Sequence, residues 1–125
     1  MQQPTHAVEC PVVFCTPQSY VWESHPFAPG LDQVVLLSQR DHAAEATIYL
    51  YQQHGSAADV PEHAHETCDD ISYVLAGSGK VEVEGYGAVS MYAGCFLRVP
   101  RGRKHRVYEL SPDFRAINIF APPRE

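Results

Sequence analysis

An all-β fold is predicted for this 125-residue chain from three observations. Short apolar segments recur along its length, Gly and Pro separate them at near-regular spacing, and no segment keeps the apolar period of a long helix. Many short strands joined by turns are typical of a sandwich or barrel. Because the length suits one domain, we expect a single domain over residues 1–125.

The predicted strands begin at residues 31–37, a short apolar run, and continue at residues 46–51, which are rich in β-branched and aromatic side chains. Residues 71–75 form a third apolar run that ends at the turn sequence AGSG. Three later segments complete the series: CFLRVP at 95–100, HRVYEL at 105–110 and FRAINIFA at 114–121.

The clearest two-residue alternation occupies residues 80–91. Val81 and Val83 fall on one side of this strand, and charged residues fall on the other. The sequence Gly85-Tyr86-Gly87 within the segment predicts a hairpin turn. Helix is expected to be minor, with a short turn near residues 41–46 as the best candidate.

Composition excludes some classes of partner. The net charge is −6, so binding to a nucleic-acid backbone is not expected. One basic cluster is interpreted as a solvated loop and strand end, with a docking patch as the alternative; it comprises Arg98, Arg101, Arg103, Lys104 and Arg106. No secretory signal pattern and no apolar run long enough for a membrane span is present, so we expect a cytoplasmic protein without a membrane partner.

The cysteines are expected to be reduced thiols; they are Cys10, Cys15, Cys68 and Cys95. Their spacing does not form the two close pairs of a structural zinc site. A second metal site at Cys10 and Cys15 remains an alternative to free thiols.

The residues that carry chemistry lie between 61 and 109. His63 and His65 are two apart, so in a strand both imidazoles would face one interior, and neutral imidazole is a good ligand for first-row divalent metals. Asp70 follows just before an apolar strand, and His105 follows a Pro-x-Gly turn much later in the chain. We therefore predict a metal centre at His63, His65, Asp70 and His105.

Three other carboxylates compete for roles near this centre. Asp69 would point to the opposite face from Asp70, and Glu66 is a weaker rival on the loop. Glu109 shares a face with His105 by strand parity, so it is a candidate acid or base in the cavity. The alternative places Glu109 at the solvated end of the strand.

These segments resemble the two signature motifs of the cupin superfamily. At residues 63–77 the His pair, four spacer residues, the acid Asp70, six residues and Gly77 follow the first motif. At residues 94–109 the register of Gly94, Pro100, Gly102 and His105 follows the second. Two positions depart from the pattern: Asp70 stands where the family has Glu, and Glu109 where it has Asn.

The resemblance implies a double-stranded β-helix, or jelly-roll-like barrel, around one divalent transition metal. Iron is the first expectation, and Mn, Ni, Zn and Cu are alternatives. Tyr49, Tyr51 and Arg98 are candidates to line the pocket and orient a substrate, against an alternative of sheet packing. The remaining histidines are interpreted as surface, loop or turn residues; they are His6, His25, His42 and His54.

The implied function is a metal-dependent enzyme acting on a small organic substrate. The substrate is expected to be small because the interior of a small barrel is narrow. An iron-dependent oxygenase is the leading hypothesis. A redox-neutral isomerase, cyclase or lyase that uses the metal as a Lewis acid is the second. A non-catalytic sensor of a metal or small ligand is the third hypothesis. The resemblance also implies a homodimer, because small members of the superfamily usually form dimers.

Overall fold

The computed structural model describes residues 12–43, 45–54 and 59–124. Antiparallel strands dominate these ranges, joined by turns and by the 3₁₀ turns η1 (Pro17–Ser19) and η2 (Gln39–Asp41). The strands are β1 (Glu23–Ser24), β2 (Leu31–Leu37), β3 (Thr47–Gln53), β4 (Val60–His63), β5 (Asp69–Ala76), β6 (Ser78–Val83), β7 (Gly87–Tyr92), β8 (Phe96–Val99), β9 (His105–Tyr108) and β10 (Arg115–Ala121).

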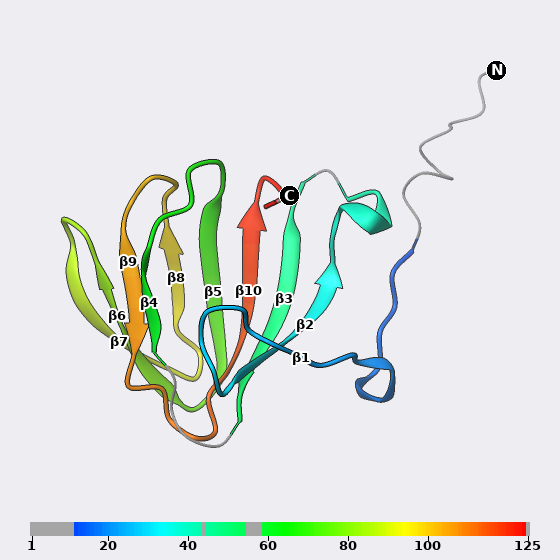
Figure 1. Ribbon diagram of the computed structural model, residues 1–125, viewed down its shortest axis with the longest axis horizontal. Helices are drawn as coiled ribbons and strands as arrows, with labels where there is room; N and C mark the ends of the chain where they lie inside the picture. The colour runs from blue at the N-terminus through cyan, green and yellow to red at the C-terminus, as the bar shows by residue number, and fades with distance from the viewer. Residues whose placement is uncertain (1–11, 44, 55–58, 125) are drawn as a thin grey trace.

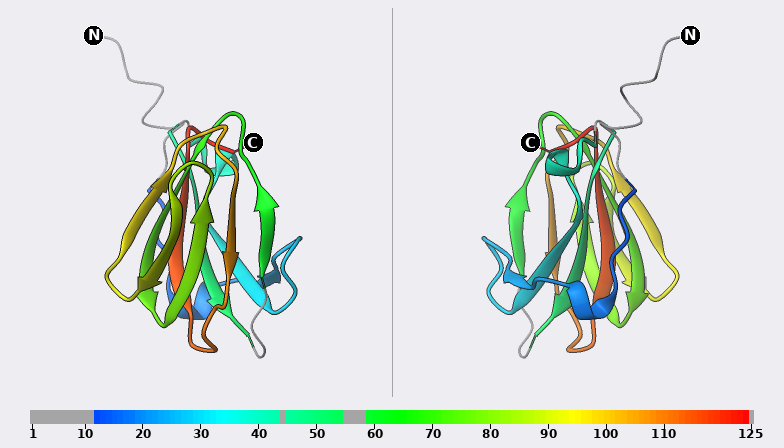
Figure 2. Two further views of the ribbon diagram at one scale, coloured as in Figure 1. Left: turned by 90° about the vertical axis from the view of Figure 1, so that its left-hand side faces the viewer. Right: turned by 90° about the vertical axis from the view of Figure 1, so that its right-hand side faces the viewer.

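Two antiparallel sheets face one another, as Figures 1 and 2 show. One sheet has the order β1-β2-β3-β10-β5-β8, and the other has the order β4-β9-β6-β7. Consecutive strands often lie in different sheets, so the chain repeatedly crosses between them. This is the double-stranded β-helix that the resemblance implied, and the segments that carry the predicted metal ligands lie where the chain changes sheet.

The core between the sheets follows the two-residue alternation of the sequence. In β6, Val81 and Val83 are buried while Lys80 and Glu82 are exposed, as predicted. Tyr51, Val74 and Phe120 of the first sheet belong to the same buried cluster as these valines. Burial of one face of each strand fixes the register, because a one-residue slip would expose the whole apolar set.

Most predicted elements are confirmed; one expectation needs correction, and one strand was not predicted. The predicted hairpin is present, with Val83 opposite Gly87 across β6 and β7. The turn expected near residues 41–46 is instead the 3₁₀ turn η2, which begins at Gln39 and ends at Asp41. The short strand β1 had no signal in the sequence, because two exposed polar residues carry no apolar pattern. Among the described residues, no helix is long and apolar enough to cross a membrane.

Gly77 is the point at which the chain leaves one sheet for the other. It follows the last residue of β5 and precedes the first residue of β6, and its φ is +75°. A Cβ at this position would lie 2.7 Å from the Cα of Phe114 and would also collide with Ser111. Glycine is therefore required here by both backbone conformation and space.

We expect Gly77→Ala to lower the free energy of unfolding by about 2–4 kcal/mol, because it adds a backbone clash to the strain of a left-handed residue. The matched control is Gly85→Ala, since Gly85 has a similar φ of +77° but nothing within 4 Å of the added Cβ. Urea denaturation of both variants measures the difference. An equal loss in the two would show that the clash contributes nothing.

Candidate metal centre

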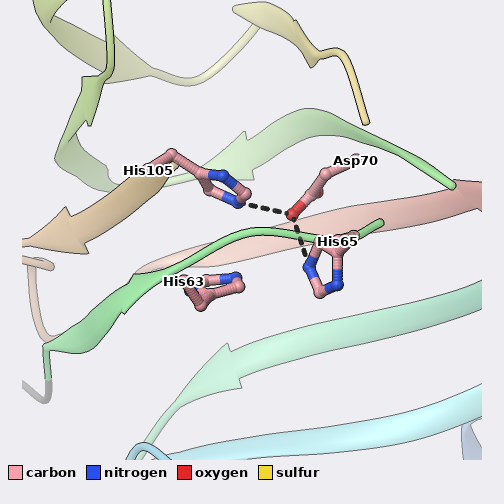
Figure 3. A group of neighbouring side chains, drawn as sticks. All are labelled: His63, His65, Asp70 and His105. Atoms are coloured by element: carbon pink, nitrogen blue, oxygen red, sulfur yellow. Dashed lines mark hydrogen bonds and ion pairs between the residues drawn. The ribbon is translucent and has the colours of Figure 1, made fainter. Parts of the chain in front are cut away.

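Four side chains from three strands and one loop converge between the sheets. They are His63, His65, Asp70 and His105, called the metal group below. Each offers a ligand atom, and these atoms all lie within 4.8 Å of one another (Figure 3). His63 ends β4 and His105 begins β9, and the two are directly opposite in the antiparallel register. Their ring centroids are 4.3 Å apart, so this pair forms one wall of the group.

His65 reaches the group from a loop and not from a strand. The sequence predicted that both histidines share a strand face, but β4 ends at His63. The loop is held instead by the backbone N–H of Gly102, which donates to the His65 carbonyl at 2.7 Å. Because Gly102 belongs to the second motif, this bond joins the loop of His65 to the loop that leads to His105.

Two of the imidazoles are oriented by carbonyl groups two residues earlier in the chain. His63 Nδ1–H donates to the Pro61 carbonyl at 2.7 Å, and His105 Nδ1–H donates to the Arg103 carbonyl at 3.1 Å. A bond of this kind fixes the tautomer and leaves Nε2 to bind a metal. Both rings therefore present Nε2 as the ligand atom.

Asp70 is oriented by a buried amide. Asn118 donates from Nδ2 to Asp70 Oδ1 at 2.8 Å, and the Ser72 hydroxyl donates to Asn118 Oδ1 at 2.7 Å. The other oxygen, Oδ2, lies 2.9 Å from His105 Nε2 and 3.4 Å from His65 Nε2. Sequence reasoning missed Asn118, although an asparagine at an inward position of the apolar strand β10 is a signal for a buried polar contact.

The ionisation of these groups is coupled. Burial raises the pKa of Asp70, but the hydrogen bonds from His105 and Asn118 and the nearby His65 imidazole outweigh it and hold that pKa well below its ordinary value. Burial lowers the pKa of His105, yet its hydrogen bond to Asp70 prevails and raises it. The pKa of His63 is lowered, chiefly by burial.

The residues fit a divalent transition metal. Among the described residues, His65 Nε2 is buried and has no hydrogen bond of good geometry, which is costly unless an ion or another ligand meets it. Three imidazoles and one carboxylate suit first-row divalent ions, and a five- or six-coordinate ion would keep positions for exchangeable ligands. Although Asp70 is shorter than the Glu of the family pattern, its carboxylate lies within reach of the three imidazoles, and Asn118 sets its orientation.

Asp69 lies outside the group, on the other side of β5. Its carboxylate accepts from the side chains of Arg98 and Arg101 and from the backbone N–H of Arg101, at 2.8–3.1 Å. Hydrogen bonds from Arg98 and then from Arg101 lower the pKa of Asp69 to about 2. This acid joins the start of β5 to the second motif instead of facing the metal site.

The candidate pocket residues are divided by the structure. Tyr51 lines a small cavity of about 60 Å³ beside the metal group, whereas Tyr49 lies in the core, stacked on Tyr51 and packed edge-on against Phe120. Arg98 is outside the cavity with its side chain 56% exposed, because in β8 the inward position belongs to Val99.

Glu109 is also outside the cavity. Its side chain is 64% exposed and pairs with Lys80 at 3.1 Å. The parity argument that aimed it inward does not apply, because β9 ends at Tyr108 and Glu109 has a φ of +52°, which turns the chain. Glu66 is likewise exposed.

His25, which the sequence analysis interpreted as a surface or loop residue, lies in a loop but lines the site. It lines both the inner cavity and a larger pocket of about 350 Å³ outside the metal group. Burial, with smaller effects of Arg124 and His63, lowers the pKa of His25 to about 4. No spacing pattern linked it to the motifs, because it comes from a separate segment before β2. Cys10 and His6 lie outside the described residues, and Cys15 is a free, exposed thiol.

Comparisons with known proteins agree on the fold. The family model for the Cupin domain matches residues 40–120. No curated protein sequence matches the chain as a relative. Three solved structures with similar folds follow. KdgF from Halomonas sp. has a TM-score of 0.74 at 24% identity, over 87% of this chain and 94% of that one.

An RmlC-like cupin from Shewanella frigidimarina has a TM-score of 0.71 at 24% identity, over 90% of this chain and 92% of that one. The polyketide cyclase RemF from Streptomyces resistomycificus has a TM-score of 0.73 at 20% identity, over 89% of this chain and 79% of that one. Sequence identities this low support a shared fold but do not indicate a shared reaction.

We expect Asn118→Ala to weaken metal affinity by about 10–100-fold, because Asp70 would lose the amide that aims its free oxygen at the group. Competition with a chelator of known affinity measures the change. The control is Ser72→Ala, which removes only the support of Asn118 and should cost less. Equal affinity of Asn118→Ala and the unaltered protein would exclude this role.

Metal affinity should fall as pH decreases, because metal binding must displace the proton that Asp70 stabilises on His105. Since the pKa of His105 is raised above 6.5, the decline should begin above that pH and approach tenfold per pH unit below it. Metal titrations between pH 5 and 9 measure this slope. An affinity independent of pH across that interval would contradict the assignment of His105 as a ligand.

Proposed function

The chain belongs to the Cupin domain family, and from that premise we propose that it is a mononuclear metal-dependent enzyme acting on a small organic substrate. The observation that carries the proposal is the convergence beside a cavity of three imidazoles, two of them oriented by carbonyl groups, and one oriented carboxylate. A structural site would be closed by its protein ligands, whereas this group adjoins both an inner cavity and an outer pocket.

Two sets of residues have different roles in this proposal: one set would hold the ion, and the other shapes the cavity beside it. When bound, a divalent metal supplies Lewis acidity and, if it is iron, the capacity to activate dioxygen. His63, His65, Asp70 and His105 would hold it, and Asn118 fixes the direction of the carboxylate. Apolar side chains line most of the inner cavity, which keeps bulk water away; they include Val81, Met91, Leu97, Val99, Val107 and Phe114.

Within this class we propose an iron-dependent oxygenase first. The donor set of three neutral imidazoles and one carboxylate suits Fe(II) and keeps positions open on the ion. The apolar inner cavity of about 60 Å³ matches a small reactant such as dioxygen better than a whole organic molecule.

A redox-neutral isomerase, cyclase or lyase is the second candidate, favoured by a separate observation. His25 lines the cavity with a lowered pKa, so a neutral imidazole stands near the metal group, where it can polarise a substrate carbonyl. The similar fold of a polyketide cyclase supports the same reaction class by analogy alone.

The test is elemental analysis of the purified protein followed by turnover assays on small carbonyl and phenolic compounds with and without dioxygen. The oxygenase predicts bound iron and substrate-dependent oxygen uptake. The second candidate predicts anaerobic turnover that zinc or nickel restores after chelation. Ligand binding without any product would favour a sensor and exclude both enzymes.

His105→Ala should remove most of the bound metal and all of the turnover while the fold persists, because strands and not the ion supply the core. Metal content and circular dichroism measure the two effects. The control is His54→Ala, since His54 is an exposed residue whose contact is Asp32. Full metal occupancy in His105→Ala would refute the assigned ligand set.

A further inference from the structure

The pocket outside the metal group is lined, in the described part of the chain, by one permanently cationic side chain, Arg124. We define the outer pocket by nine residues: His25, Phe27, Val60, Pro61, Glu62, His63, Ala64, His65 and Arg124. Its volume of about 350 Å³ is that of a small-molecule site. Two of its residues, His63 and His65, belong to the metal group, so a molecule seated here would meet the ion.

We propose that the outer pocket binds the carboxylate of a small organic acid, with Arg124 as its anchor and His25 as a hydrogen-bond donor to a second oxygen of that molecule. This inference rests on the proposed function and names its substrate class. Three features of the described residues carry it: the fixed position of Arg124, the lack of a protein counter-ion for it, and the tautomer of His25.

Arg124 is held in place from several sides. Its backbone N–H donates to Thr47 Oγ1 at 3.1 Å, and its guanidinium lies over the ring of Phe120, 4.8 Å from the centroid. The guanidinium also lies near the Tyr51 phenol. The Phe120 ring is in turn 5.0 Å from the ring of His65, so the cation is positioned one residue away from the metal group.

The charge of Arg124 has no partner in the described part of the chain. Arg124 takes part in none of the ion pairs found there, whereas Arg98, Arg101 and Arg106 each form one. Among the described residues, Glu62 is the single acid that lines the outer pocket. Its side chain is exposed, so solvent screens its charge, whereas Arg124 is half-buried. A half-buried guanidinium presents paired N–H donors that match a carboxylate.

The hydrogen bonds of His25 determine which of its nitrogens can donate. The backbone N–H of Phe27 donates to His25 Nδ1 at 3.1 Å, so Nδ1 is the acceptor and the neutral ring carries its proton on Nε2. Nε2 has no hydrogen-bond partner among the residues that the structure describes. The ring lines both cavities and packs edge-on against Tyr51, which itself contacts Arg124.

Together these residues form a wall distinct from the metal ligands. Arg124 would bind the carboxylate, and His25 Nε2–H would donate to a carbonyl or hydroxyl oxygen on the same molecule. A carboxylate held in this way would leave the rest of the substrate over the metal group. The substrate class is therefore a small acid with a second oxygen function near its carboxylate, such as a 2-oxo acid.

The test is isothermal titration calorimetry with matched acids and amides: pyruvate against pyruvamide, and propionate against propionamide. Both metal-loaded and chelator-treated protein are used, because the metal could itself bind a carboxylate. We expect the acid to bind about tenfold or more tightly than its amide in both forms. Arg124→Gln should abolish that preference without changing metal content, and Arg124→Lys should keep part of it.

The matched control is Arg40→Gln, which removes the same charge from an exposed arginine in η2, outside the outer pocket. Acid preference that survives Arg124→Gln, or that disappears when the metal is removed, would overturn the proposal. So would the failure of every acid to bind at millimolar concentration. Because chelator-treated protein is tested separately, absence of metal or turnover would defeat the proposed function without affecting this result.

The role of His25 is tested with His25→Asn, whose amide oxygen can still accept from Phe27 N–H but which has no donor at the Nε2 position. Pyruvate should bind several-fold more weakly to this variant, and propionate, which has no second oxygen function, should bind as before. His25→Gln, which restores a donor of similar reach, should recover part of the affinity for pyruvate. Equal losses for pyruvate and propionate would refute the donor role.

Discussion

The metal group depends on hydrogen bonds between two stretches of chain that are about thirty residues apart in the sequence. These bonds, called the clamp below, join Asp69 and His65 to Arg98, Arg101 and Gly102. Asp69 accepts three hydrogen bonds from the side chains of Arg98 and Arg101 and one from the backbone of Arg101. The N–H of Gly102 donates to the carbonyl of His65. These bonds fix the loop before β9, and the position of His105 opposite His63 follows from them.

Neighbouring acids in β5 serve opposite sides of the sheet. Because successive side chains of a strand alternate, Asp69 faces the arginines of the clamp while Asp70 faces the histidines. Both carboxyl pKa values are lowered, one by guanidinium and backbone N–H groups and the other by imidazoles and an amide. The same dipeptide thus connects the scaffold to the site.

The space around the metal group has two chemically different sides. The imidazoles and Asp70 form one side, and their orientation is set by Pro61, Arg103 and Asn118. His25, Tyr51 and Arg124 form the other, brought together from the segment before β2, from β3 and from the residues after β10. A substrate between these sides would meet an ion on one and hydrogen-bond donors on the other.

The sequence by itself determined most of the strands and their alternation, because strand parity is a local property, and the spacing of its two motifs indicated the four positions that converge in the metal group. It could not place Asn118, His25 or Arg124, whose contacts join segments with no shared periodicity. Strand parity alone left two positions open for Glu109, and the structure has the solvated one, because the positive φ that follows β9 turns its side chain away from the cavity. Only tertiary structure decided these positions, since a side chain's partners across the barrel are set by how the sheets pack.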